Sequence, residues 1–241
     1  MKKIIYLLIC LFSLSTSLAQ QKTIVDQNAS LRNLNGRSFT KIDVSHAIKL
    51  IITQGTEQSI AVSANEESYK DDIVTEIEGN TLKIYSKNNN TVLSNRRNRK
   101  LTVYVSFTKL EELEASGATD VVAVDVVDLS SLKLEVSGAS TIKAKLKVNY
   151  LNIELSGASK AQLSGMAIDA KIECNGASDL NAYGLSIDKA NLDASGASSI
   201  YFTVMKEMRV EASGASSIRY KGTAVVTNIK TSGASSVSKA D

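Results

Sequence analysis

A four-residue phrase, Ser-Gly-Ala-Ser or a close variant, recurs seven times in the second half of this 241-residue chain. The copies begin at Ser116, Ser137, Ser156, Asn175, Ser195, Ser213 and Ser232. Successive copies are therefore 18 to 21 residues apart. A period of about twenty residues indicates a solenoid, in which each repeat forms one coil and equivalent strands stack in register.

Side chains around the phrase alternate between apolar and charged, as in a strand with one buried face. Large aliphatic residues stand three positions before each copy: Leu113, Leu134, Ile153, Ile172, Leu192, Val210 and Ile229. A second apolar column stands five positions after the first residue of each copy: Val121, Ile142, Ala161, Leu180, Ile200, Ile218 and Val237. Each repeat is thus predicted to contain a strand, a corner and a second strand.

The glycine of each phrase is predicted to form the corner, because it adopts φ > 0 at little cost and leaves room for the next corner. These structural glycines are Gly117, Gly138, Gly157, Gly176, Gly196, Gly214 and Gly233. The alternative is a row of nucleophilic serines. Such a row needs a base within reach, but the single histidine, His46, lies outside the repeats. We predict no catalytic, metal-binding or cofactor-binding residue.

The repeat predicts an all-β fold, specifically a single-stranded parallel β-helix, and the crossover rule favours right-handed coiling. An antiparallel β-sandwich is the alternative, although it would not require a corner at one fixed register. Residues 38–241 are interpreted as a single domain, with irregular opening coils over 38–110 and the seven repeats over 111–241. Residues 20–37 are polar and are expected to form a flexible lead.

Residues 1–19 have the pattern of a secretory signal peptide, with a basic start, an apolar run and a small-x-small site that ends at Ala19. Cys10 lies inside the apolar run, a position that disfavours lipoprotein processing. We therefore expect an exported protein, located in the periplasm, at the outer cell surface or outside the cell. Cys174 would then have no disulfide partner, and its place in an inward column predicts a buried apolar role.

Charge is nearly balanced after export, because removal of Lys2 and Lys3 leaves 26 basic residues against 25 acidic ones. This balance argues against nucleic acid as a partner. One outward column is acidic: Glu114, Glu135, Glu154, Glu173, Asp193 and Glu211. A row of Ca²⁺ sites is one interpretation. The adjacent column favours a salt-bridged, solvated face instead: Lys133, Asn152, Lys171, Asn191, Arg209 and Asn228.

A short basic run contains Arg96, Arg97, Arg99 and Lys100. It is a candidate surface contact for an anionic glycan or a lipid headgroup, and a solvated loop is the alternative.

The stretches FTKIDVSHAIKLIITQG, EGNTLKI and LEVSGASTI resemble the bacterial auto-transporter adhesin "head GIN domain" family, which is common among exported proteins of Bacteroidetes. The resemblance covers roughly residues 38–225. It implies a single-stranded β-helix in an exported or surface setting and supplies no catalytic residues.

The predicted function is therefore non-enzymatic, with a structural or adhesive role at the bacterial cell envelope. A cell-surface glycan or an envelope protein is the expected partner. Homo-oligomers are expected to form through an open β edge at the last coil. Two alternatives remain open: a polysaccharide-acting β-helix enzyme, and a periplasmic scaffold or regulator.

Overall fold

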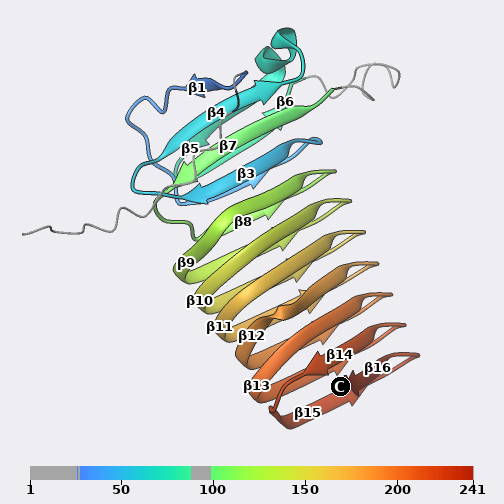
Figure 1. Cartoon of the computed structure of the whole chain (residues 1–241). Coiled ribbons are helices and arrows are strands. Elements are labelled where there is room, and N and C mark those ends of the chain that lie inside the picture. Colours follow the sequence, from blue (N-terminus) through green and yellow to red (C-terminus); the bar gives the residue numbers. More distant parts are fainter. Residues whose placement is uncertain (1–25, 27, 88–98, 241) are drawn as a thin grey trace, which may run out of the picture.

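The computed structural model describes residues 26, 28–87 and 99–240, and most of them lie in strands that wind into a solenoid (Figure 1). Its central part consists of five long strands, each bent around one coil and paired in parallel with the next. They are β9 (Asp120–Val136), β10 (Thr141–Leu155), β11 (Lys160–Cys174), β12 (Asp179–Ala194) and β13 (Ser199–Ala212). The prediction of a parallel β-solenoid with one repeat per coil is confirmed.

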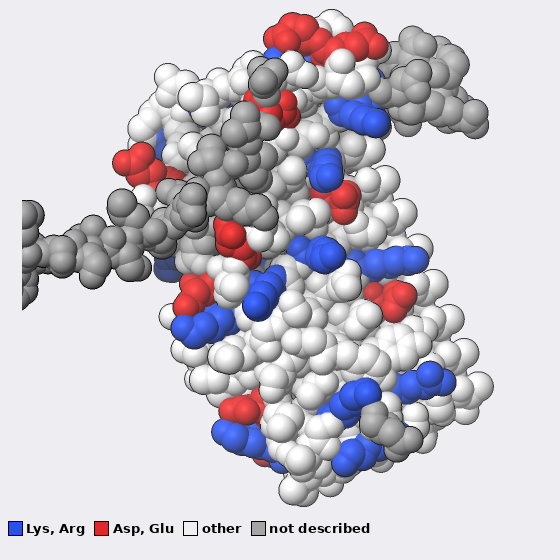
Figure 2. Space-filling view, viewed as in Figure 1, with Lys and Arg blue, Asp and Glu red and all other residues white. Residues whose placement is uncertain are grey.

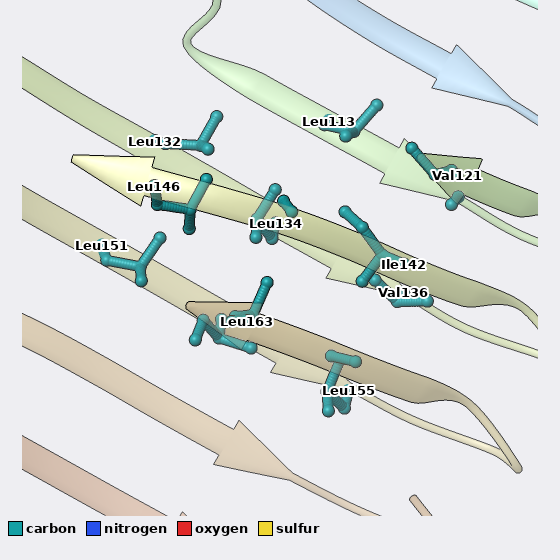
Figure 3. Close-up of a cluster of buried hydrophobic side chains, with 14 of the residues drawn as sticks. Leu113, Val121, Leu132, Leu134, Val136, Ile142, Leu146, Leu151, Leu155 and Leu163 are labelled. Carbon is teal, nitrogen blue, oxygen red and sulfur yellow. The ribbon is translucent and has the colours of Figure 1, made fainter. Parts of the chain in front are cut away.

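The coils stack so that equivalent residues of successive repeats face each other. Ile153 pairs with Leu134 on one side and with Ile172 on the other. The two apolar columns point into the coil and are buried through the sixth repeat. Figure 3 shows part of this core, where Leu134 stacks on Leu113 and Ile142 stacks on Val121 of the preceding coil. The alternation seen in the sequence is therefore the alternation between core and solvent.

The glycine corners form a continuous stack along one edge of the solenoid. All seven glycines have φ between +68° and +77°. From the second corner onward, the alanine N–H of each corner donates a hydrogen bond of 2.7 Å to the glycine carbonyl of the preceding corner. The last residue of the phrase is buried from Thr119 to Ser216. Three of these residues, Thr119, Ser198 and Ser216, donate their hydroxyl to the carbonyl three positions earlier.

The first coil of the chain consists of β2 (Lys41–Val44) and β3 (Lys49–Gln54), which pair in parallel with β8 (Glu112–Ala115) and β9. The register places the turn of residues 45–48 directly on the first glycine corner. His46 takes the position of the glycine and has the same left-handed φ, +67°. This turn is thus a variant of the repeated corner that the sequence analysis did not recognise.

The next two coil strands, β6 (Thr81–Ser86) and β7 (Leu101–Phe107), stack on the opposite side of β2 and β3. The coil that comes second in the chain is therefore outermost in space. These coils do not follow one another in chain order. This difference arises because β2 and β3 can each pair along both edges. β6 and β7 pair along one edge, and the chain then returns to place β8 and β9 along the opposite edge.

Antiparallel strands cover the outer coil. β4 (Ser59–Ala64) pairs with β7, and β5 (Ile73–Glu78) pairs with β6. The short 3-10 helix η1 (Glu67–Asp72) connects β4 to β5 at the end of the solenoid (Figure 1). Burial continues to this end, because Ile60, Val62 and Ile73 belong to the same core as the repeats.

Part of the stretch predicted to be a flexible lead is ordered instead. Ser30–Arg32 forms β1, which pairs antiparallel with β4. Arg37 also donates a hydrogen bond of 3.0 Å to the carbonyl of Ile77. The predicted signal peptide, residues 1–19, lies outside the described residues.

The last coil consists of β14 (Ser217–Lys221), β15 (Val225–Thr231) and β16 (Ser236–Lys239). Ile229 belongs to the inward aliphatic column but is 42% exposed. Val225 and Val226 of the same strand are also exposed. The predicted burial therefore fails in the seventh repeat, because within the described residues no further coil covers it.

Candidate binding surface

One outer face of the solenoid carries the acidic row predicted from the sequence. The parallel register aligns its members from Glu114 to Glu211 on successive coils. Asp43 of the first coil pairs with Glu114 and extends the row by one residue. Strands in a sheet are about 4.8 Å apart, so unneutralised carboxylates in such a row repel one another.

Basic residues of the adjacent column neutralise much of this row. Lys133 contacts Glu135 and lies 3.5 Å from Glu154. Lys171 pairs with Glu173 at 2.5 Å and Arg209 pairs with Glu211 at 2.8 Å; both distances join the side-chain nitrogen to a carboxylate oxygen. The mixed column therefore makes the ion pairs that its spacing predicted. Among residues 26, 28–87 and 99–240, no group of three or more His, Cys, Asp or Glu side chains is placed to hold a metal ion.

The pKa values of two carboxyl groups in the row are shifted in opposite directions. Burial raises the pKa of Glu114, and the charges of Asp43 and Glu135 act in the same direction. Hydrogen bonds from Arg209 and Lys230 lower the pKa of Glu211. A raised folded-state pKa means that the folded chain holds the proton more tightly than the unfolded chain. The contribution of Glu114 to stability is therefore present below its unfolded pKa and is lost as pH rises through its folded pKa.

Glu114→Gln is expected to raise the free energy of unfolding at neutral pH and to have little effect in acid, where Glu114 is itself protonated. Glu211→Gln is the matched control with the opposite sign, because it removes a carboxylate whose charged form is favoured by folding. Urea unfolding of both variants and the wild type across the acidic to neutral range measures the difference. The same pH dependence in both variants would contradict this account.

The basic run predicted as a surface contact is only partly described, because Arg96 and Arg97 lie outside the described residues. Arg99 is used within the protein: it pairs with Asp72 at 2.6 Å, and its guanidinium lies 5.2 Å from the centre of the Tyr69 ring. Its side chain is mostly buried. The backbone N–H of Lys100 donates to the side chain of Asn65, and its side chain is exposed. Arg99 therefore links the start of β7 to η1, and its guanidinium is not free to contact a ligand.

His46 and Cys174, the two further residues considered in the sequence, make contacts only within the protein. His46 is exposed at its corner. Its Nδ1 shares a hydrogen bond of 3.0 Å with the hydroxyl of Ser45, and its ring lies edge-on to that of Tyr85. Cys174 is fully buried, as predicted from its column. Burial raises the pKa of the Cys174 thiol to about 12, so the group stays neutral and unreactive at physiological pH.

A groove of about 860 Å³ crosses the coils at the bend in the middle of the long strands. Its floor is one apolar column, which contains Leu132, Leu151, Ala170 and Ala190. Met208 continues the column on the next coil. These residues are almost completely buried and belong to the core, so the floor exposes little side-chain surface.

Polar columns form the two walls of the groove. One wall is the mixed column next to the acidic row: Lys133, Asn152, Lys171, Asn191, Arg209 and Asn228. Tyr150, Asp169, Lys189 and Glu207 align on successive coils of the other wall. Tyr150 is 64% exposed. The lining spans seven coils, from Glu111 to Asn228, which corresponds to roughly 29 Å at the usual strand spacing.

One wall of this groove, the mixed column, was recognised in the sequence, but the groove itself was not. The other wall stands six positions before each phrase and contains Tyr150, Asp169, Lys189 and Glu207. These residues share neither size nor charge, so this column is less visible in the sequence than the acidic and aliphatic ones. Within the described part of the chain, no helix combines the length and apolarity needed to cross a bilayer.

The protein is thus a parallel β-solenoid with regular outer faces. Its glycine corners are stacked, one face carries ion pairs, and a groove crosses the coils. The chain belongs to the family described as "Putative auto-transporter adhesin, head GIN domain", whose model matches residues 38–224. The family resemblance inferred from the repeats is confirmed. None of the curated proteins matches the chain.

Several solved structures share the fold. A "putative adhesin" from Bacteroides fragilis is 19% identical with a TM-score of 0.80, and the match covers 89% of this chain and 98% of that chain. A "putative adhesin" from Parabacteroides merdae is 18% identical with a TM-score of 0.68 and coverages of 90% and 98%. A "putative lipid binding protein" from Parabacteroides distasonis is 18% identical with a TM-score of 0.60 and the same coverages. Identities this low establish a common fold and no more.

Proposed function

We propose that the protein is an exported, non-enzymatic solenoid with an adhesive or structural role at the bacterial cell envelope. The observation that carries this proposal is the regular register of the coils from β9 to β13. This register holds columns of outward side chains on a rigid backbone, as an extended binding surface requires. Membership in an adhesin-type family supports the same role.

A polysaccharide-acting enzyme is a weaker account of the groove. Glycoside hydrolysis needs two carboxyl groups that flank one bond as acid and base or nucleophile. In the groove wall, Asp169 and Glu207 lie two coils apart and Lys189 lies between them in the register. This arrangement supports binding in preference to catalysis.

The location is tested by protease and antibody accessibility of the protein on intact producing cells. Digestion or labelling without opening the outer membrane is the result expected of a surface adhesin. A periplasmic protein of known location serves as the control for membrane integrity. Protein that becomes accessible only after the outer membrane is opened would overturn the adhesive role and leave a periplasmic scaffold or regulator.

We further propose that two copies of the chain associate through the last coil. The exposed apolar residues Val225, Val226 and Ile229 lie on β15, which pairs with β13 on one side. Within the described residues, its other edge has no neighbouring strand, and open edges favour pairing with another chain. Light scattering is expected to give a mass above that of a monomer, and Val226→Lys is expected to lower it. A monomer mass for the wild type at micromolar concentration would contradict association.

A further inference from the structure

We infer that the groove binds a neutral, extended glycan chain that lies across the coils, parallel to the solenoid axis. This inference rests on the proposed function and names the ligand class for it. Four properties of the groove carry it: its shape, its aromatic residue, its unused hydrogen-bonding groups and its balanced charge.

The shape of the groove and its exposed aromatic ring suit sugar rings. The groove is long, because its lining comes from seven consecutive coils, from Glu111 to Asn228. Tyr150 lies on one wall and exposes its ring. Such a ring offers a flat surface for the C–H face of a sugar, while the tyrosine hydroxyl remains free to bond.

The asparagines of one wall have unused hydrogen-bonding capacity. Asn152 donates from Nδ2 to Glu154 at 2.9 Å, but its Oδ1 has no partner. Nδ2 of Asn228 also lacks a partner. Asn191, between them, makes no side-chain hydrogen bond to any other described residue. Buried polar atoms without partners are rare in proteins, and rotation of these amides can direct the free groups toward hydroxyls of a ligand.

The charge of the groove favours a neutral ligand over a polyanion. The cations of one wall, Lys133, Lys171 and Arg209, are each paired with a carboxylate of the acidic row. The opposite wall alternates in sign from Asp169 through Lys189 to Glu207. A polyanion would therefore meet as much repulsion as attraction. Figure 2 shows one face of the molecule, where acidic and basic residues are scattered over the coils.

The wall next to the acidic row has a period of two coils, because cation and amide alternate along it. Two strand spacings correspond to about 9.6 Å, which is close to the length of a disaccharide in an extended glycan. A peptide is a poorer occupant. Backbone groups of β10, β11 and β12 are already paired in the sheet, so an extended peptide could not add to it as a strand.

The test is isothermal titration calorimetry of the purified protein with neutral β-linked hexasaccharides, including cellohexaose and chitohexaose, and with hexagalacturonate as the anionic comparison. A neutral hexasaccharide is expected to bind with an affinity that salt does not change. Tyr150→Ala removes the exposed ring of the groove, and Asn191→Ala removes one of its unpaired amides. Each variant is expected to weaken binding by about tenfold or more.

Tyr183→Ala is the matched control, because Tyr183 contacts Tyr201 and does not line the groove. Circular dichroism and the thermal midpoint verify that each variant is folded. Three results would overturn the inference: no binding of any neutral hexasaccharide, binding that both groove variants leave unchanged, or binding of hexagalacturonate alone that salt abolishes. Accessibility on intact cells does not depend on these results, so the proposed function and the ligand class can fail separately.

Discussion

Replacement of Gly196 by alanine is expected to lower the free energy of unfolding by roughly 3 kcal/mol. Gly196 has φ of +72°, a conformation that costs an L-residue energy through contact between Cβ and the backbone. The added Cβ would also lie 2.4 Å from the carbonyl oxygen of Gly176 on the preceding corner. That carbonyl accepts the 2.7 Å hydrogen bond from Ala197, so it cannot move away without loss of the bond.

Gly79→Ala is the matched control for Gly196→Ala. Gly79 has a similar φ of +61°, but a Cβ there would meet no atom within 4 Å. Its replacement should cost about 1 kcal/mol, from the backbone conformation alone. Urea unfolding followed by far-ultraviolet circular dichroism gives both values. Equal losses in the two variants would show that corner stacking contributes nothing beyond the choice of φ.

The corners could be predicted from the sequence because their requirement is local. A left-handed residue with no room for a Cβ must be glycine, and the same need recurs in every coil, so the pattern repeats visibly. His46 shows the limit of this reasoning. It has the same φ as the glycines, but it lies on the end of the stack where a side chain is tolerated. The sequence therefore no longer carries the glycine that identifies the turn.

The order of the opening coils could not be predicted for a different reason. Alternation shows that β2, β3, β6 and β7 each have a buried face, but it does not specify which strands are neighbours. Both edges of β2 accept a parallel partner, and β6 and β8 occupy one each. Pairing of this kind depends on contacts between distant segments, and many pairings satisfy the same periodicity.

The groove was missed because one of its walls has no repeated chemistry. The mixed column is recognisable through its cations and amides, but Tyr150, Asp169, Lys189 and Glu207 share neither size nor charge. The register makes these four residues neighbours on successive coils, where they form the second wall. A repeat protein can therefore acquire a binding surface through outward residues that leave its folding pattern unchanged.

Replacement of Ile172 by alanine should lower the free energy of unfolding by about 3.5 kcal/mol, because it creates a cavity in a closely packed core. Ile172 is completely buried, and the register stacks it between Ile153 and Leu192. Solenoid stability is the sum of contacts within coils and between neighbouring coils. A cavity in a central coil weakens the contacts on both sides.

Ile229→Ala is the control from the same column, since Ile229 occupies the equivalent position in the seventh repeat and is 42% exposed. Its loss should cost less than about 1 kcal/mol in a monomer. Association through the last coil would change this outcome, because Ile229 would then be covered by a second copy. The cost of Ile229→Ala should therefore rise with protein concentration if the last coil pairs with another chain. A cost that stays small at every concentration would exclude that pairing, while a small cost for Ile172→Ala would contradict the stacked core itself.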